Sequence, residues 1–276
     1  MSDIVSAGWL MQNLDKVRVV DASWYMPADK RDAKAEFEAA HIPGAAFYDI
    51  DTLSDRNTSL PHMLPPPDQF ARDAGALGIG DDDMVVVYDG AGIFSAPRVW
   101  WALKAMGHDK VAVLDGGLPA WKDAGGAIQS GPAAPRPATF HARPNTAILR
   151  DFGAVKAALG NTQVLDARSA PRFEGSEPEP RAGLKSGHMP GAANIPYRAV
   201  LTGNGKLKDD GALQKLFAEK GLDLRAPIIT SCGSGVTAAI LMLALEKVGS
   251  RQVAIYDGSW TEWGGRDDAP IATGPA

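Results

Sequence analysis

The sequence contains the same unit twice, and this repetition constrains the fold more than any other feature. The segments VRVVDASW and AHIPGAAFYDI in the first half resemble TQVLDARS and GHMPGAANIPY in the second half. Further along, MVVVYDG resembles PIITSCG, and VAVLDGGLPAW resembles VAIYDGSWTEW. Each copy spans about 120 to 140 residues, which is the size of a small domain. A chain repeated in this way is expected to form two similar domains.

The join between the two copies is rich in proline. Four prolines lie between residues 131 and 147, and the segment has no helical periodicity. Proline density of this kind is typical of an extended linker. We therefore predict an N-terminal domain over residues 1–130, a linker over 131–147 and a C-terminal domain over 148–276.

Each copy alternates short apolar runs with segments of helical spacing. The runs are rich in β-branched residues and predict buried parallel strands; they are Val17–Asp21, Val85–Tyr88, Val111–Leu114, Val164–Asp166, Ile228–Ser231 and Val253–Tyr256. Helical spacing occupies residues 96–106 and 236–248, and Gly249 is the expected end of the second helix. The alternation predicts an α/β fold with two tandem domains, each a mainly parallel sheet flanked by helices.

Composition and charge exclude several classes of protein. Lys and Arg number 28 against 33 Asp and Glu, so the net charge is −5, unlike that of a general nucleic-acid binder. No run of about 18 apolar residues predicts a membrane-spanning helix. Residues 1–10 include Asp3 and lack the apolar stretch of a secretory signal or the arginines of a transit peptide. We expect a cytoplasmic protein that binds neither nucleic acid nor membrane.

Cys232 is the single cysteine, which excludes an internal disulfide and any cysteine-cluster metal site. It follows a predicted strand and precedes Gly233 and Gly235, at the carboxyl end where α/β sheets bind ligands. The glycines allow successive N–H groups to point at one place, and the helix behind adds its positive end. A lone cysteine can be an inert core residue, but this position favours a stabilised thiolate facing a cleft. Asp89 takes the same place in the first copy.

The segment SCGSGVTAA, together with the tandem arrangement and the cysteine in the second copy alone, resembles the rhodanese/sulfurtransferase family over nearly the whole chain. The fold class expected from this resemblance is two tandem rhodanese-like domains. Within the family, CGSGVT is similar to the loop of the 3-mercaptopyruvate sulfurtransferases. Thiosulfate sulfurtransferases carry a more basic loop, and Gly233 and Ser234 stand where its arginine and lysine would be. Thiosulfate is a dianion, whereas 3-mercaptopyruvate carries one carboxylate.

The resemblance implies covalent catalysis without a metal or cofactor. Cys232 would attack the sulfur of 3-mercaptopyruvate, become a persulfide and release pyruvate. A thiol such as thioredoxin or glutathione, or cyanide, would then accept the outer sulfur. Two alternatives stay open at this point: thiosulfate:cyanide transfer, and a persulfide carrier that performs no catalysis.

The resemblance also implies which residues form the site. Ser234, His62 and Asp51 match a proposed relay, in which a carboxylate fixes the imidazole and the imidazole polarises the hydroxyl. Asp55 is an alternative to Asp51, and His62 could instead be a surface histidine. The loop itself contributes the substrate-binding residues Gly233, Gly235, Val236 and Thr237.

Arg172 and Arg181 match the carboxylate clamp of the family, a task that suits the paired donors of arginine. The alternative is surface pairing, of Arg172 with Glu174 and of Arg181 with Glu177 or Glu179. A clamp has to face away from these acidic neighbours. His41 and His188 take the same place in both copies although only one copy has the cysteine, so we expect both histidines to be structural.

Overall fold

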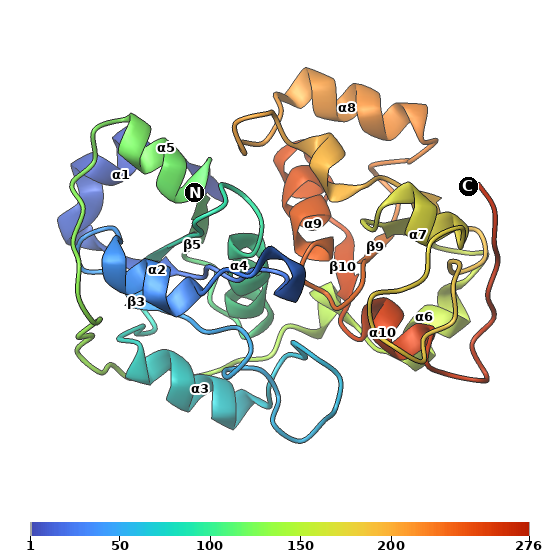
Figure 1. The fold of residues 1–276 in the computed structure, drawn as a ribbon, viewed down its shortest axis with the longest axis horizontal. Helices are drawn as coiled ribbons and strands as arrows, with labels where there is room; N and C mark the ends of the chain where they lie inside the picture. The colour runs from blue at the N-terminus through green and yellow to red at the C-terminus, as the bar shows by residue number, and fades with distance from the viewer. Residues whose placement is uncertain (1, 276) are drawn as a thin grey trace. The chain divides into compact units, whose positions relative to one another are not determined.

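The computed structural model describes residues 2–275, which form two compact units (Figure 1). Unit 1 consists of residues 2–57, 64–145 and 203–207, and unit 2 of residues 58–63, 146–202 and 208–275. Residues 58–63 therefore belong to unit 2, although the chain on both sides of them belongs to unit 1. This assignment places His62 in the same unit as Cys232.

Each unit is built on a five-stranded sheet in which every paired strand is parallel. The strand order is β1-β5-β4-β2-β3 in unit 1 and β6-β10-β9-β7-β8 in unit 2. The strands are β1 (Ile4–Val5), β2 (Val17–Asp21), β3 (Ala46–Phe47), β4 (Met84–Tyr88), β5 (Val111–Leu114), β6 (Leu149–Arg150), β7 (Gln163–Asp166), β8 (Ala193–Asn194), β9 (Ile228–Ser231) and β10 (Val253–Tyr256). The predicted fold class, two parallel α/β domains in tandem, is confirmed.

Helices flank both sheets, and α4 and α9 pack beside the central strands of their units (Figure 1). The α-helices are α1 (Ala7–Asn13), α2 (Ala33–Ala39), α3 (Pro67–Ala76), α4 (Ala96–Ala105), α5 (Gly117–Asp123), α6 (Phe152–Ala158), α7 (Ala170–Glu174), α8 (Asp210–Glu219), α9 (Ala238–Lys247) and α10 (Ser259–Trp263). Short 3₁₀ turns occur at Leu14–Lys16, Pro27–Asp29, Thr146–Ile148 and Tyr197–Val200. Helix α9 begins two residues later than its spacing predicts, which leaves a longer loop after Cys232.

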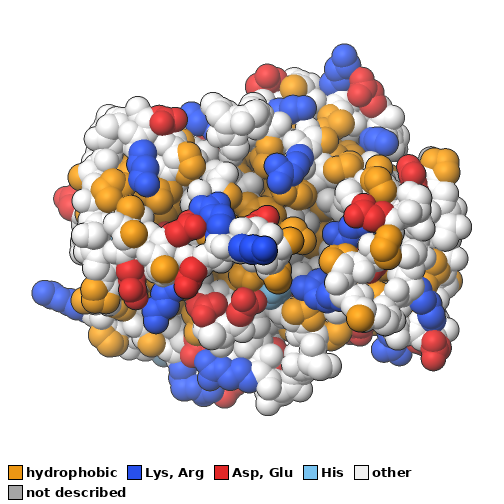
Figure 2. All heavy atoms as spheres, in the orientation of Figure 1, with side chains coloured by type: hydrophobic (Ala, Val, Ile, Leu, Met, Phe, Trp, Pro, Cys, Tyr) orange, Lys and Arg blue, Asp and Glu red, His pale blue; other side chains and the backbone are white. Residues whose placement is uncertain are grey.

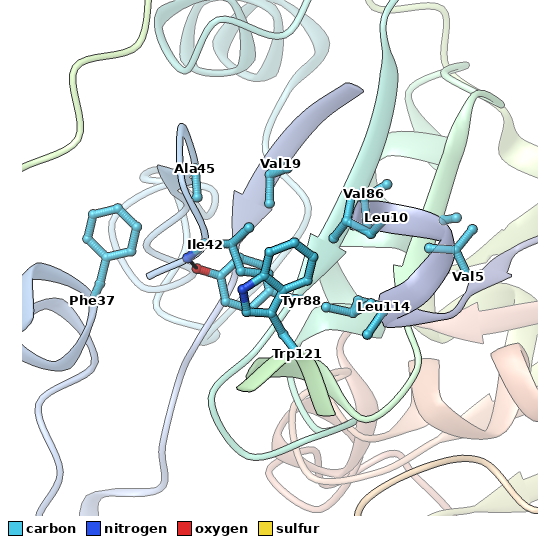
Figure 3. Close-up of a cluster of buried hydrophobic side chains, with 12 residues drawn as sticks. Val5, Leu10, Val19, Phe37, Ile42, Ala45, Val86, Tyr88, Leu114 and Trp121 are labelled. Atoms are coloured by element: carbon cyan, nitrogen blue, oxygen red, sulfur yellow. Dashed lines mark hydrogen bonds between the residues drawn. The ribbon is translucent and has the colours of Figure 1, made fainter. Parts of the chain in front are cut away.

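The core of unit 1 lies between its sheet and helices and contains large side chains, including Tyr88 and Trp121 (Figure 3). The Tyr88 hydroxyl accepts a hydrogen bond from the Ile42 amide at 3.2 Å, so its polar end is satisfied inside the core. The ring of His41 stacks on Phe37 and its Nδ1 lies 2.7 Å from the Phe37 carbonyl. In unit 2, His188 stacks on Phe173 and contacts its carbonyl in the same way. These contacts agree with the structural role expected for both histidines.

The proline-rich segment has no helix or strand between residues 131 and 145 and runs along unit 1. Ala138 donates to the Gly75 carbonyl at 2.8 Å, and Arg143 donates to the Met106 carbonyl at 2.8 Å. The domain limits at residues 130 and 148 stay a prediction.

Charged side chains of both signs are interspersed on the face drawn in Figure 2. Within residues 2–275, no helix combines the length and the apolar character needed to cross a membrane.

Candidate active site

The loop that carries Cys232 is held at its base by helix α10. The amide of Trp260 donates to the Cys232 carbonyl at 2.9 Å, and the amide of Thr261 donates to the Gly233 carbonyl at 2.9 Å. The Thr261 hydroxyl donates to the same Gly233 carbonyl at 2.6 Å. Strands β9 and β10 are parallel neighbours, so their carboxyl ends lie side by side and bring this loop next to the start of α10.

Ser259 fixes the cysteine from the other side. Its Oγ accepts the Cys232 amide at 3.2 Å and donates to the Tyr256 carbonyl at 2.8 Å. Ser259 has a φ of 48°, a left-handed conformation that disfavours side chains. The matching residue in unit 1 is Gly117, also left-handed at φ 54°. Unit 2 therefore has a serine in a strained conformation where unit 1 has glycine, and the sequence analysis missed this residue although the repeat marks the difference.

The two glycines of the loop are needed for different reasons. Gly235 has a φ of 79°, which fits the backbone freedom expected of it. Gly233 allows a close approach, because a Cβ atom there would lie 3.2 Å from Arg172 Nη2, a tight contact, and 3.9 Å from Arg181 Nη1. Both predicted clamp arginines therefore converge on the loop, one residue from the cysteine. Arg181 Nη1 also donates to Thr261 Oγ1 at 3.5 Å, so Thr261 links this arginine to the loop.

Arg172 is held by a buried carboxylate. Its Nη2 lies 2.5 Å from one oxygen of Glu179 and its Nε lies 3.2 Å from the other. Glu179 belongs to a longer chain of charges, because the oxygen that faces Arg172 Nε also contacts Arg168 Nη1 at 2.7 Å, and Arg168 Nη2 contacts Asp166 at 2.7 Å. Glu179 is thus the partner of Arg172, in place of the surface pairing with Glu174 that the sequence left open.

Arg168 was not singled out by the sequence analysis. Its side chain is 1% exposed, it lies over the ring of Trp260, and Nη2 also donates to the Gly187 carbonyl at 2.8 Å. Ser23 takes its place in the first copy, so the repeat again marks a position that differs between the two units. Since Trp260 holds the Cys232 carbonyl, Arg168 connects the arginine cluster to the cysteine loop.

His62 approaches Ser234 although 172 residues separate them in the chain. His62 Nδ1 lies 2.9 Å from Ser234 Oγ, and both residues are buried. The backbone of His62 is left-handed at φ 63°, an uncommon conformation for a residue other than glycine. A strained backbone that aims a side chain at a neighbouring hydroxyl is typical of functional sites.

The acidic partners considered for His62 belong to unit 1. Asp51 Oδ2 accepts the indole N–H of Trp24 at 3.1 Å. Asp55 Oδ1 accepts the amide of Asn57 at 2.9 Å and its side-chain amide at 3.1 Å. Which of the two carboxylates partners His62 stays a prediction.

The exposed edge of the loop lies at Gly233. Cys232 itself is only 2% exposed and Val236 is equally buried, whereas Gly233, Arg172 and Arg181 are partly exposed. The partly exposed residue next to the thiol, Gly233, thus lies beside the two guanidinium groups. Thr237 precedes the first residue of α9. Within residues 2–275, no group of three or more His, Cys, Asp or Glu side chains is arranged to hold a metal ion.

The matching loop of unit 1 contains its own anion. Asp89 Oδ2 accepts the amides of Phe94, Ser95 and Ala96 at 2.8 to 3.0 Å, and Oδ1 accepts the amide of Ala91 at 2.9 Å. Burial raises the pKa of Asp89 from 3.8 to about 6, although these amide bonds lower it. The amides at the start of α4 thus point at the side chain that follows β4.

The comparisons with known proteins agree with this architecture. The Rhodanese-like domain family matches residues 6–124 and 152–266, so the chain belongs to this family. A human 3-mercaptopyruvate sulfurtransferase is 45% identical over 94% of this chain and 91% of its own length. An Arabidopsis thaliana relative, thiosulfate/3-mercaptopyruvate sulfurtransferase 1, mitochondrial, is 43% identical over 97% of this chain and 77% of its own length. The crystal structure of SseA from Escherichia coli, described as a 3-mercaptopyruvate sulfotransferase with the rhodanese fold, has a TM-score of 0.86 and 38% identity and covers 94% of this chain and 99% of its own.

The left-handed backbone of Ser259 leads to a stability prediction. Ser259→Ala and Ser259→Gly both lose the two hydrogen bonds of the hydroxyl, but only glycine relieves the backbone strain. We expect the glycine variant to be more stable than the alanine variant by about 1 kcal/mol. Urea unfolding of the two variants measures the difference. An alanine variant of equal or greater stability would show that this backbone carries no strain.

The raised pKa of Asp89 leads to a prediction about pH. The folded unit binds the Asp89 proton more tightly than the unfolded chain, so this stabilising contribution is present at low pH and is lost as the pH rises through about 6. Asp89→Asn cannot titrate. From pH 7 to pH 5, the unfolding free energy of the parent should rise relative to this variant by roughly 1 kcal/mol. Urea unfolding at both pH values checks this, and a difference that is independent of pH would contradict it.

Proposed function

We propose that this protein is a sulfurtransferase that takes sulfur from 3-mercaptopyruvate, carries it as a persulfide on Cys232, passes it to a thiol or cyanide and releases pyruvate. The observation that carries the proposal is the approach of two guanidinium groups to Gly233, beside the only cysteine. A nucleophilic sulfur next to paired cations suits a donor that carries a transferable sulfur and a carboxylate.

The donor binds with its carboxylate against Arg181 and Arg172 and its sulfur toward Cys232. The Cys232 thiolate forms a bond to the donor sulfur, and the carbon–sulfur bond breaks with its electron pair on carbon. The product is the enolate of pyruvate, which takes up one proton, and the enzyme is left with a persulfide. A thiolate acceptor then attacks the outer sulfur, and the Cys232 thiolate is regenerated.

The backbone amides of the loop after β9 are placed to stabilise a negatively charged sulfur on Cys232. In unit 1 the equivalent loop directs four amides at the Asp89 carboxylate. Cys232 takes the position of Asp89 in the repeat, and amides at the start of a helix have no partners within that helix. We propose that the amides of the loop from Gly233 to Thr237, Gly235 and Val236 included, stabilise the thiolate and the persulfide.

Ser234 and His62 provide the proton that the reaction needs. The separation of 2.9 Å between Ser234 Oγ and His62 Nδ1 supports a shared proton: His62 Nδ1–H donates to Ser234 Oγ, which leaves the serine hydroxyl hydrogen free to be donated to the sulfur donor. A carboxylate on the other side of the imidazole would fix its tautomer, and Asp51 is our proposed partner, with Asp55 as the alternative. In this arrangement Ser234 polarises the carbonyl side of the donor while charge develops on the leaving carbon.

Thiosulfate is the second candidate donor, because the Arabidopsis relative is named for both compounds. The neutral residues Gly233 and Ser234 favour 3-mercaptopyruvate, since a dianion gains more from cations in the loop itself. Thioredoxin and glutathione are the proposed thiol acceptors. The cytoplasm is the proposed location, although the Arabidopsis relative is named as mitochondrial.

The central experiment is intact-protein mass spectrometry. After brief mixing with 3-mercaptopyruvate and removal of the donor, the parent protein should gain one sulfur atom and release one equivalent of pyruvate. Cys232→Ser should do neither, because an alcohol at this position is a far weaker nucleophile than a thiolate. Mixing with thiosulfate in parallel identifies the donor class. Pyruvate release by a folded Cys232→Ser variant at the parent rate would refute the nucleophile assignment.

The arginine pair leads to a kinetic prediction. Arg181→Ala should raise the KM for 3-mercaptopyruvate at least about tenfold, because a charged hydrogen bond to the carboxylate is lost. Arg225→Ala is the matched control, since Arg225 carries the same charge, is 94% exposed and pairs with Asp223 at 3.5 Å. Initial-rate assays of pyruvate release compare the two variants. An equal change in both would assign the effect to overall charge and would remove Arg181 from the clamp.

A further inference from the structure

We propose that Glu179 determines the donor preference of this site, by neutralising one of its cations so that the site fits a monocarboxylate and disfavours a dianion. This inference rests on the proposed function, and it assigns Glu179 a positioning and specificity role without contact with the reacting atoms. The loop motif of Cys232 does not predict this role, because Glu179 lies outside the motif, in a proline-rich stretch earlier in the sequence.

Glu179 occupies both of its oxygens with arginine. One oxygen contacts Arg172 Nη2 at 2.5 Å, and the other contacts Arg168 Nη1 at 2.7 Å and Arg172 Nε at 3.2 Å. The carboxylate side chain is 2% exposed, so water screens these contacts little. One edge of the Arg172 guanidinium is therefore committed to Glu179, and the group is held with Nη2 beside Gly233.

Counting charges shows what remains for a substrate. The cluster contains the three cations Arg168, Arg172 and Arg181 and the two carboxylates Asp166 and Glu179. Asp166 is paired with Arg168 and Glu179 bridges Arg168 and Arg172, so the cluster retains one positive charge. A donor with one carboxylate balances that charge, whereas a donor with two negative charges leaves an excess that a partly buried site stabilises poorly.

Glu179→Gln is the informative change because it removes the charge and preserves the shape. The glutamine oxygen can still accept a hydrogen bond from one arginine. Arg168 also retains Asp166 and the Gly187 carbonyl as partners. In the variant, Arg172 carries a charge that no carboxylate offsets, and the cluster holds two positive charges. Such a site is matched to thiosulfate.

The experiment measures kcat/KM for thiosulfate and for 3-mercaptopyruvate with the same acceptor, in the parent and in each variant. Glu179→Gln should raise the ratio of the thiosulfate value to the 3-mercaptopyruvate value about tenfold, since a charged contact to the donor changes. Glu177→Gln is the matched control, because Glu177 is exposed, lies two residues away and carries the same charge. It should leave the ratio within about twofold, as expected for a screened surface charge.

A second variant guards against failure of folding. Glu179→Asp keeps the charge but its shorter side chain cannot span Arg168 and Arg172 equally, so the ratio should shift in the same direction by a smaller factor. Thermal unfolding establishes that each variant is folded. An unchanged ratio in folded Glu179 variants, or an equal shift in Glu177→Gln, would overturn the inference. A parent protein that uses neither donor would instead refute the proposed function.

Discussion

The hydrogen bonds between the cysteine loop and the start of α10 are the constraint on which the site depends. A loop of glycines and small residues after β9 has many conformations available to it, and fixing one of them costs entropy. The amides of Trp260 and Thr261 and the hydroxyl of Ser259 offset that cost by binding the backbone of Cys232 and Gly233. They can do so because a parallel pairing of β9 with β10 ends both strands at the same edge. The sheet therefore determines where the sulfur lies.

The two units differ in the residue that follows the equivalent central strand, which is Asp89 after β4 and Cys232 after β9. In unit 1 amides of the loop donate hydrogen bonds to the Asp89 carboxylate, which belongs to the same loop. In unit 2 the equivalent side chain is a thiol, which accepts hydrogen bonds only weakly. Unit 2 also carries left-handed backbones at His62 and Ser259. Both of these strained residues contact the loop proposed to be catalytic, His62 through Ser234 and Ser259 through Cys232, as expected when stability is given up for function.

The sequence predicts the central strands well because they are buried on both faces and are continuous apolar runs, as at Val111–Leu114. It misses the edge strands, such as β1 and β6, because two residues are too few for any periodicity. The cysteine and its loop can also be predicted, because the signal lies in a few consecutive residues of the sequence. The roles of Arg168, Glu179 and Ser259 cannot be predicted in this way, because they depend on contacts with residues that are distant in the sequence. A comparison of the two copies would have marked Arg168 and Ser259, because Ser23 and Gly117 replace them.

The geometry around Gly233 also shows how two ways of binding an anionic donor differ. One solution places cations in the loop, with an arginine directly after the cysteine. The other brings arginines from outside the loop, as Arg172 and Arg181 do here, and Arg172 Nη2 lies 3.2 Å from where a Cβ atom of residue 233 would be. A side chain at that position would lie against Arg172 Nη2 and, if it were an arginine, would add a third positive charge to the pair. Glycine after the cysteine and the carboxylate of Glu179 behind Arg172 are therefore parts of one arrangement, in which space and charge are both matched to a single carboxylate.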